Sequence, residues 1–343
     1  MVNVRKRSEA IRRFIIEEVE AHPRDIARLV SSKFGITRQA VHHHLKQLVQ
    51  EGCLSEAGNT RGKTYALASL EQIRFEYQID DSLTEGKVWS RDVMPALRHL
   101  PTNVLNVWHY SFTEMMNNAI EHSEGTGITV FIEKTAAHVQ MFITDDGVGI
   151  FKKIQKALDL LDERQSLLEL VKGKFTTDPK NHSGEGIFFT SRMFDEYAIL
   201  SGSVMFSHDH GEKEDWLLQR EVPGAGTTVA MKLNNHTSRT TAKVLAQFST
   251  DDDFGFTKTV VPVRVAEFGD DNLVSRSQAR RLLARFERFR VVVLDFAGVD
   301  EIGQAFADEV FRVFAKLHPE VEIVPTHANE AVRRMITRAI SHS

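Results

Sequence analysis

The pattern of apolar and polar residues divides the chain into three parts. Up to about residue 70, apolar residues recur every three or four positions in three successive stretches, which predicts three helices. Two short alternating stretches around a Gly-Asn-Thr-Arg-Gly-Lys turn follow and predict a β-hairpin. From residue 258 onward, strand patterns alternate with helical ones, which predicts an α/β sandwich. Between these parts, helices and strands surround several glycine-rich motifs.

The three N-terminal helices have recognisable ends. Ser8 is expected to cap the first helix, and the polar break at His22-Pro23 is expected to end it. Gly35 suits the end of the second helix, because glycine readily adopts the left-handed conformation found there. Thr37 is expected to cap the third helix, which has one apolar face and one basic, hydrogen-bonding face.

A chain of 343 residues is too long for one ordinary core, which predicts several domains. Residues 71–100 are expected to be a connector with helical character, and residues 236–257 a linker or linking helix. The predicted domains are therefore 1–70, 101–235 and 258–343.

The composition is that of a soluble chain in a reducing compartment. The single cysteine, Cys53, has no internal partner for a disulfide and excludes a cysteine-based zinc cluster. No apolar run reaches the roughly 18 residues of a membrane helix, and charges interrupt the apolar residues near the N-terminus. A cytoplasmic location without a membrane partner is expected.

The charge is unevenly distributed along the chain. Residues 1–70 contain 12 Lys and Arg against 7 Asp and Glu, whereas the remaining 273 residues contain 31 against 40. The N-terminal part is therefore the one suited to meet a polyanion.

The order of three helices and a hairpin resembles a winged helix-turn-helix of the bacterial repressor kind. In such folds the third helix enters the major groove, while the wing contacts phosphates. The resemblance implies DNA as a partner, and a homodimer, because such proteins usually bind two half-sites. The implied DNA-binding residues are Arg38, Gln39, His42, His43 and Lys46 on the third helix, and Arg61 and Lys63 on the wing. The alternative is a protein-protein or dimerisation module with a solvated basic face.

A polar stripe marks the helix predicted around FTEMMNNAIEH. Glu114, Asn118 and Glu121 follow one another at i, i+4 and i+7, so they share one helix face. Such a stripe either lines a cavity or faces water.

Three glycine-rich motifs follow this helix. The alternating strand HVQMFITD runs into Asp145-Asp146-Gly147-Val148-Gly149, where glycines allow a sharp turn close to a ligand. Gly184 and Gly186 precede a helix, whose free backbone N–H groups suit phosphate oxygens. The sequence Gly224-Ala225-Gly226-Thr227-Thr228 then opens a predicted strand.

In this order, the four motifs resemble the N, G1, G2 and G3 boxes of the gyrase, histidine-kinase and MutL (GHKL) superfamily. The resemblance implies ATP and Mg²⁺ as cofactors, with Asp145 accepting a hydrogen bond from the adenine amino group. It implies that Asn118 binds Mg²⁺ and that Thr227 supports the adenine end. Gly147 and Gly149 would shape the pocket beside the base, and Gly184 and Gly186 would hold phosphates.

The same resemblance implies a lid over residues 151–183. Lys172, Lys174 and Lys180 lie in this lid and are expected to reach the phosphates.

Glu114 determines the fate of the bound ATP. Family members that hydrolyse ATP have a glutamate four residues before the asparagine, where it orients and deprotonates a water molecule. Glu114 therefore implies catalysis, with either water or a protein hydroxyl as acceptor. The alternative is that Glu114 and Asn118 only solvate a helix face.

The run VVVLDFAGVDEIGQAFADEVFRVF resembles the STAS-like fold of anti-sigma-factor antagonists. Many antagonists have a phosphorylated serine at the start of the helix, but residues 300–304 here have no hydroxyl. That departure argues against a phosphorylation switch at this loop. A docking surface for a protein partner would comprise Asp295, Asp300, Gln304, Phe306 and Asp308, although an ordinary strand and amphipathic helix explain the pattern equally well.

The expected fold is a multidomain α+β protein with an N-terminal winged helix, a central GHKL (Bergerat) α/β sandwich and a C-terminal STAS-like α/β domain. The favoured function is a DNA-binding regulator controlled by its nucleotide state. A serine/threonine kinase or anti-sigma-type partner switch is the alternative. A sensor histidine kinase is disfavoured, because His99 and His109 lack a phosphoacceptor context.

Overall fold

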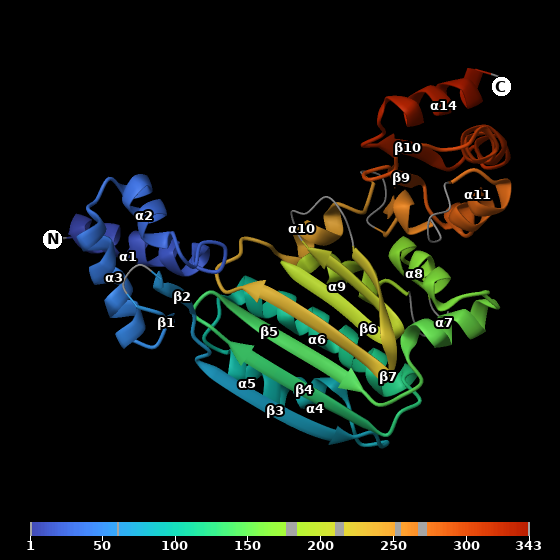
Figure 1. Ribbon diagram of the computed structural model, residues 1–343. Coiled ribbons are helices and arrows are strands. Elements are labelled where there is room, and N and C mark those ends of the chain that lie inside the picture. Colours follow the sequence, from blue (N-terminus) through green and yellow to red (C-terminus); the bar gives the residue numbers. More distant parts are fainter. Residues whose placement is uncertain are drawn as a thin grey trace. The chain divides into compact units, whose positions relative to one another are not determined.

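The computed structural model describes residues 2–59, 62–175, 184–209, 216–250, 255–266 and 273–341 (Figure 1). Internal contacts divide the chain into two compact units. The first unit comprises residues 1–75, 130–142 and 232–237, and the second comprises residues 76–129, 143–231 and 238–343.

The N-terminal segment consists of three helices and a hairpin. Its elements are α1 (Val2–Glu18), α2 (Ile26–Phe34), α3 (Arg38–Gln50), β1 (Leu54–Ala57) and β2 (Thr64–Leu67). The helices and the hairpin share one apolar core, in which Ile15, Val30 and Leu45 are completely buried. These elements match the predicted order, whereas their identity as a winged helix stays a prediction.

Two of the four predicted helix ends are confirmed, and a third differs, because α1 ends at Glu18, before the polar break at His22-Pro23. Gly35 ends α2 in the left-handed conformation with φ of 60°, and the Thr37 hydroxyl accepts the N–H of Ala40 at 3.2 Å. The Ser8 cap is wrong, because α1 already begins at Val2. Charged side chains on the exposed first turns, including an Arg5–Glu9 ion pair one turn apart, are compatible with this longer helix.

A five-stranded sheet forms the centre of the fold (Figure 1). Its strands are β3 (Glu71–Gln78), β4 (Gly127–Lys134), β5 (His138–Asp145), β6 (Glu196–Asp209) and β7 (Trp216–Asn234), in the order β3-β4-β5-β7-β6. The helices α6 (Thr102–His122) and α9 (Gly186–Met193) contact each other and lie across one face of the sheet.

Strand alternation shows which face of this sheet the helices cover. In β5, Val139, Met141 and Ile143 are at most 2% exposed, while the intervening residues are half-buried. Because successive strand residues point to opposite faces, the buried set faces the helices. Asp145 continues the buried set and therefore also lies on the helix side.

Two sequence predictions in this region need correction. Residues 71–78 form the edge strand β3 and not part of a helical connector; the helical turns α4 (Glu85–Val88), η2 (Trp89–Val93) and α5 (Met94–Leu97) follow later. The glycine-rich residues 224–228 lie inside the long strand β7 and do not open it.

Two helices follow β5. They are α7 (Ile150–Leu158) and α8 (Glu163–Lys172), which contact each other. The predicted lid therefore has helical structure up to residue 172, and its last part, residues 176–183, lies outside the described residues.

The C-terminal segment is the predicted α/β domain. Its parallel sheet has the order β10-β9-β8, formed by β8 (Lys258–Pro262), β9 (Val291–Asp295) and β10 (Glu322–Thr326). The remaining elements are η3 (Val263–Ala266), α11 (Arg276–Leu283), η4 (Phe286–Arg288), α12 (Gln304–Asp308), η5 (Glu309–Phe314), α13 (Ala315–Leu317) and α14 (Glu330–Ser341).

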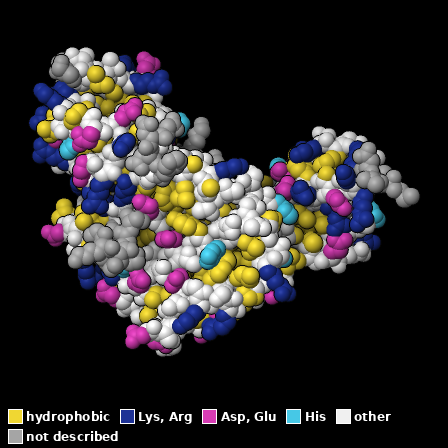
Figure 2. Space-filling view, turned by 180° about the vertical axis from the view of Figure 1, so that it is seen from behind, with side chains coloured by type: hydrophobic (Ala, Val, Ile, Leu, Met, Phe, Trp, Pro, Cys, Tyr) yellow, Lys and Arg dark blue, Asp and Glu magenta, His cyan; other side chains and the backbone are white. Residues whose placement is uncertain are grey.

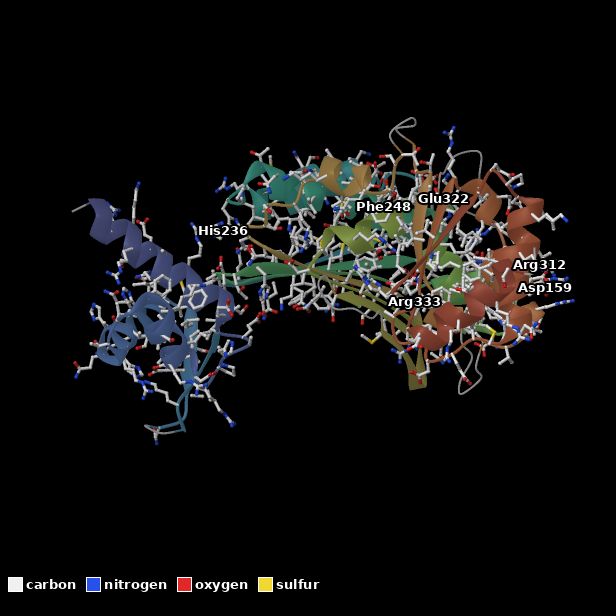
Figure 3. The ribbon with its side chains drawn as sticks, turned by 90° about the horizontal axis from the view of Figure 1, so that it is seen from above. Asp159, His236, Phe248, Arg312, Glu322 and Arg333 are labelled. Carbon is white, nitrogen blue, oxygen red and sulfur yellow. The ribbon has the colours of Figure 1, made fainter. Side chains whose placement is uncertain are left out.

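An aromatic cluster attaches the predicted linker to the central core. The linker contains the short helix α10 (Thr241–Ala246), and Phe248 follows it (Figure 3). The Phe248 ring lies 4.9 Å from that of Phe188, which in turn lies 4.5 Å from Phe256. Residues 241–248 are therefore packed against α9 and are not a free linker.

The surface is mixed in charge. On the face shown in Figure 2, Lys and Arg side chains are interspersed with Asp and Glu side chains. None of the described helices combines the length and apolar content that crossing a bilayer requires.

The aromatic cluster gives a test of the linker's structural role. Phe248→Ala should lower the free energy of unfolding by about 3–5 kcal/mol, because it leaves a cavity in the aromatic cluster beside α9. Urea denaturation followed by circular dichroism measures this change. The control is Leu317→Ala, at a side chain that is 70% exposed, which should change stability by less than about 0.5 kcal/mol. Equal effects of the two substitutions would contradict the packing described.

Candidate functional site

A cavity of about 270 Å³ lies between the central sheet and the helices that cover it. Most of its walls are apolar and come from β5, β6, β7, α6, α7 and α8. These wall residues are Met115, Ala119, Ile143, Ile150, Ile154, Leu170, Ile199 and Val229. Flat apolar walls with a few fixed polar groups are typical of sites for small organic ligands.

Asp145 is the buried acidic group of this cavity, with only 6% of its surface exposed. Its Oδ1 accepts the backbone N–H of Gly147 at 2.9 Å and that of Thr227 at 3.2 Å. Both of these bonds are made by Oδ1, which leaves Oδ2 as the oxygen for a ligand donor. Burial raises the pKa of Asp145, and the two N–H groups oppose the shift by stabilising the carboxylate.

Thr227 ties three segments together at the same end of the cavity. Its hydroxyl accepts the N–H of Ile150 at 3.0 Å and donates to the Ser201 hydroxyl at 3.3 Å. The preceding residue, Gly226, has φ of 70°, and a Cβ atom there would overlap the carbonyl oxygen of Asp145. Only glycine fits this approach of β7 to β5.

Asp146 has a different role from its neighbour. Its carboxylate accepts the N–H groups of Thr126 and Gly127 at 2.7 and 2.9 Å, and the Thr126 hydroxyl at 2.7 Å. These bonds, led by that of the Gly127 N–H, lower the pKa of Asp146 to about 2. Asp146 thus holds the turn before β4 and does not line the cavity.

Gly147 and Gly149 shape the cavity indirectly, since neither lines it. A Cβ atom on Gly147 would overlap the Ser123 carbonyl, and one on Gly149 would lie 2.6 Å from the Ser201 hydroxyl. Gly149 also has φ of 88° at the start of α7. The two glycines therefore allow the chain to turn tightly after Asp145.

The polar stripe of α6 faces the cavity in part. Glu114 and Asn118 line it, and His122 continues the row one turn further on. Glu121 shares the polar helix face but is exposed and lies outside the cavity.

The start of α9 lies against the same stripe. Gly184 and Gly186 both line the cavity. A Cβ atom on Gly186 would overlap the Glu114 carboxylate, so glycine permits this close approach. The first N–H groups of α9 have no acceptor within the helix and suit an anion.

Two of the three lysines predicted to reach the phosphates do not line the cavity. Lys172 is 1% exposed and bonds to Glu169, and Lys174 donates to the carbonyl of Arg288. Lys180 lies outside the described residues. The cation that does line the cavity is Lys153 on α7, which donates to the carbonyl of His122 at 2.8 Å and pairs with Glu124 at 3.0 Å.

Lys153 and His122 were both missed by sequence reasoning. His122 carried a usable signal, because it lies four residues after Asn118 on the same helix. The only sequence signal for Lys153 was its position after the glycines, one helical turn into α7.

The comparisons with known families agree with this geometry. Residues 108–237 match the family model described as histidine kinase-, DNA gyrase B-, and HSP90-like ATPase. This part of the chain is a GHKL ATPase domain. The matched range runs from α6 to the end of β7 and so contains all four motifs. Residues 278–333 match a STAS-like domain of unknown function (DUF4325). No curated protein matches the chain.

The family implies ATP, typically with Mg²⁺, and the cavity of the ATPase domain fits such a ligand. Its apolar walls suit a flat base, and the buried carboxylate of Asp145 suits an exocyclic amino group. Asn118 and the start of α9 offer an oxygen ligand and N–H donors further along the cavity.

Five of the seven predicted DNA-binding residues are exposed on one helix. Arg38, Gln39, His42, His43 and Lys46 all lie on the surface of α3. On the hairpin, Lys63 pairs with Glu56 at 2.6 Å, while Arg61 lies outside the described residues.

The docking surface considered for the STAS-like domain is partly wrong. Phe306 is completely buried, because it lies on the inner side of α12, which contacts α11 and α14. Asp308 has both oxygens bonded to Arg312, and Asp295 accepts a hydrogen bond from the N–H of Ala297.

The two neighbouring aspartates give a matched test of the site. Asp145→Asn should weaken ATP binding by about 100-fold, because an amide nitrogen replaces the oxygen that accepts from the base. The adjacent Asp146→Asn should leave affinity within about twofold, since Asp146 does not line the cavity. Isothermal titration calorimetry with Mg²⁺ and a nonhydrolysable ATP analogue measures both. Unchanged affinity in the Asp145 variant would overturn the site assignment.

Proposed function

We propose that this protein is an ATP-hydrolysing regulator whose nucleotide state controls its engagement of DNA. The proposal rests chiefly on one observation, the place of Glu114 in the cavity of Asp145, directly against the start of α9. A carboxylate there adds a candidate general base to a nucleotide site.

Different residues of the ATPase domain bind different parts of the ligand. Asp145 accepts a hydrogen bond from the amino group of the base, and Thr227 holds Asp145 in place through its backbone N–H. Asn118 supplies an amide oxygen, a ligand type suited to Mg²⁺. The N–H groups at Gly184 and Gly186 receive phosphate oxygens.

The phosphate end of the cavity is acidic. Glu114 and Glu185 both line it, and both contribute to raising the pKa of the neighbouring Tyr110, whose burial is the larger cause. A negative environment of this kind favours a triphosphate that is accompanied by a divalent cation over a triphosphate without one. Mg²⁺ at Asn118 would thus offset the charge of the two carboxylates.

Glu114 acts on water in this proposal. It lies one helical turn before Asn118, so both side chains point into the same part of the cavity. From that position the carboxylate orients a water molecule and accepts its proton as the water oxygen bonds to the terminal phosphorus. The bond from that phosphorus to the bridging oxygen breaks, and ADP leaves.

The N-terminal segment supplies the proposed DNA contact. The exposed face of α3 carries Arg38 and Lys46 together with hydrogen-bonding side chains, and the segment has an excess of positive charge. Phosphate and base-edge contacts require these residue types. Nucleotide binding controls DNA only if it favours one of two conformations that differ in DNA affinity.

Catalysis is tested by a conservative change of the base. Glu114→Gln should retain ATP binding within about threefold and reduce hydrolysis by at least about 100-fold, since an amide accepts no proton. The matched control is Glu121→Gln, on the same helix but outside the cavity, which should keep full activity. Phosphate release measures turnover. Normal turnover in the Glu114 variant would exclude this role, and radioactive phosphate retained on the protein would indicate a kinase instead.

DNA binding is tested on α3. The double variant Arg38→Ala and Lys46→Ala should weaken binding to random-sequence duplex DNA. The slope of log affinity against log salt concentration should become shallower by about one for each lost phosphate contact. Arg334→Ala, at an exposed arginine of α14, is the control and should bind as the wild type does. Fluorescence anisotropy at several salt concentrations measures both. Equal affinity of all three proteins would contradict the DNA-binding proposal.

The coupling between the two activities has its own test. DNA affinity should differ between the ATP-analogue-bound and free protein, and DNA should change the rate of ATP hydrolysis. Fluorescence anisotropy and phosphate release measure the two directions. If both are unaffected, the two activities are independent and the protein is not a nucleotide-controlled DNA regulator.

A further inference from the structure

The helix α8 is buried on every side. Each residue from 165 to 173 is less than 9% exposed, including the charged residues Glu169 and Lys172. The helix contacts α7, α9 and β6 of the ATPase domain, and β8 and η3 beside it in the STAS-like part of the same compact unit. A helix buried in this way is part of a core and not a free lid.

Lys172 anchors this helix to the C-terminal segment. Its ammonium donates to Glu169 at 2.7 Å and to the carbonyls of Arg281 and Ala284 at 2.8 and 3.1 Å. These two carbonyls belong to the last turn of α11, where a cation is favoured by the helix dipole. Burial lowers the pKa of Lys172 to about 8. With three acceptors for three N–H groups, the buried ammonium is fully bonded.

A second set of bonds surrounds this anchor. Arg285 forms an ion pair with Glu169 and also donates to the Glu169 carbonyl at 3.1 Å. Thr259 on β8 donates its hydroxyl proton to the Lys172 carbonyl at 2.8 Å. Lys174 and Arg288 each donate to the carbonyl of the other, at 2.9 and 3.1 Å.

The residues from 169 to 175, hereafter the strap, have a second side. Leu170 and Phe175 line the nucleotide cavity, whereas Glu169, Lys172 and Lys174 bond to the C-terminal segment. The Arg285 guanidinium lies 5.0 Å from the centre of the Phe175 ring. Arg285 therefore contacts both a cavity-lining residue of the strap and Glu169, which bonds to the C-terminal segment. The position of this cavity wall thus depends on contacts outside the ATPase domain.

We propose that the STAS-like domain positions the strap wall of the nucleotide cavity, with Arg285 and Lys172 as the positioning residues. The inference rests on ATP binding as proposed above. A change in the STAS-like domain that releases Arg285 from Glu169 frees Leu170 and Phe175 to leave the cavity. The apparent affinity for ATP then falls in proportion to the fraction of molecules that keep the strap in place.

Two arginines of the same segment allow a matched experiment. Arg285→Glu places a carboxylate against the buried Glu169 of the strap. Arg280→Glu places one against the buried Glu309, which Arg280 contacts at 2.7 Å within the STAS-like domain. Glu169 and Glu309 have side chains that are each 8% exposed, and only the first change crosses to the strap. The Arg280 side chain is 70% exposed and that of Arg285 17%, so the stability of each variant is measured beside its affinity.

We expect Arg285→Glu to weaken binding of a nonhydrolysable ATP analogue with Mg²⁺ by about tenfold and to raise KM more than it lowers kcat. Arg280→Glu should stay within about twofold of the wild type. Calorimetry and steady-state hydrolysis on the full chain measure these values, with thermal melting to establish folding. Equal affinity in all three proteins, or equal losses in both variants, would overturn the proposal.

A second measurement needs no variant and decides the matter if Arg285→Glu does not fold. Because coupling is reciprocal, the analogue should slow hydrogen exchange at the C-terminal end of α11 and in β8 of the wild type. Unchanged exchange there, with slowed exchange around Asp145, would overturn the inference and leave the ATP site intact. A wild type that does not bind the analogue at all would instead defeat the proposed function.

Discussion

The buried carboxylate of Asp145 is the constraint on which the rest of the site depends. A charge with so little exposure is stable only where hydrogen-bond donors surround it. The donors are backbone N–H groups of the glycine turn and of β7, so both segments must approach β5 closely. Gly226 is required for that approach. A single polar group thus determines where two glycine-rich motifs come together.

The opposite end of the cavity is organised by α6. Its inner face carries apolar side chains that pack on the sheet, such as Met115, and its polar row carries Glu114 and Asn118. One helix therefore provides both the packing that closes the sandwich and the groups proposed to do the chemistry. A substitution in the apolar row would disturb both the packing and the cavity, whereas one in the polar row changes mainly the polar groups of the cavity.

The sequence predicted features that depend on neighbouring residues and missed those that depend on distant ones. The cap at Thr37, the strand ending in Asp145 and the alternation of the C-terminal strands all follow from local patterns. The edge strand β3 is an exception, because the alternation of Ile73, Phe75 and Tyr77 with polar residues is a local strand signal that was overlooked. Lys172 was misjudged because its carbonyl acceptors follow more than 100 positions later.

The burial of α8 has a consequence for what counts as a domain in this chain. The range that matches the ATPase family ends at residue 237, but the acceptors of Lys172 and the partner of Glu169 lie beyond it. A fragment cut at that boundary would lose the β8 and η3 contacts of α8 and would leave a buried ammonium without its two carbonyls. The range that matches the family and the compact unit of the structure are therefore different, and the second extends into the C-terminal segment.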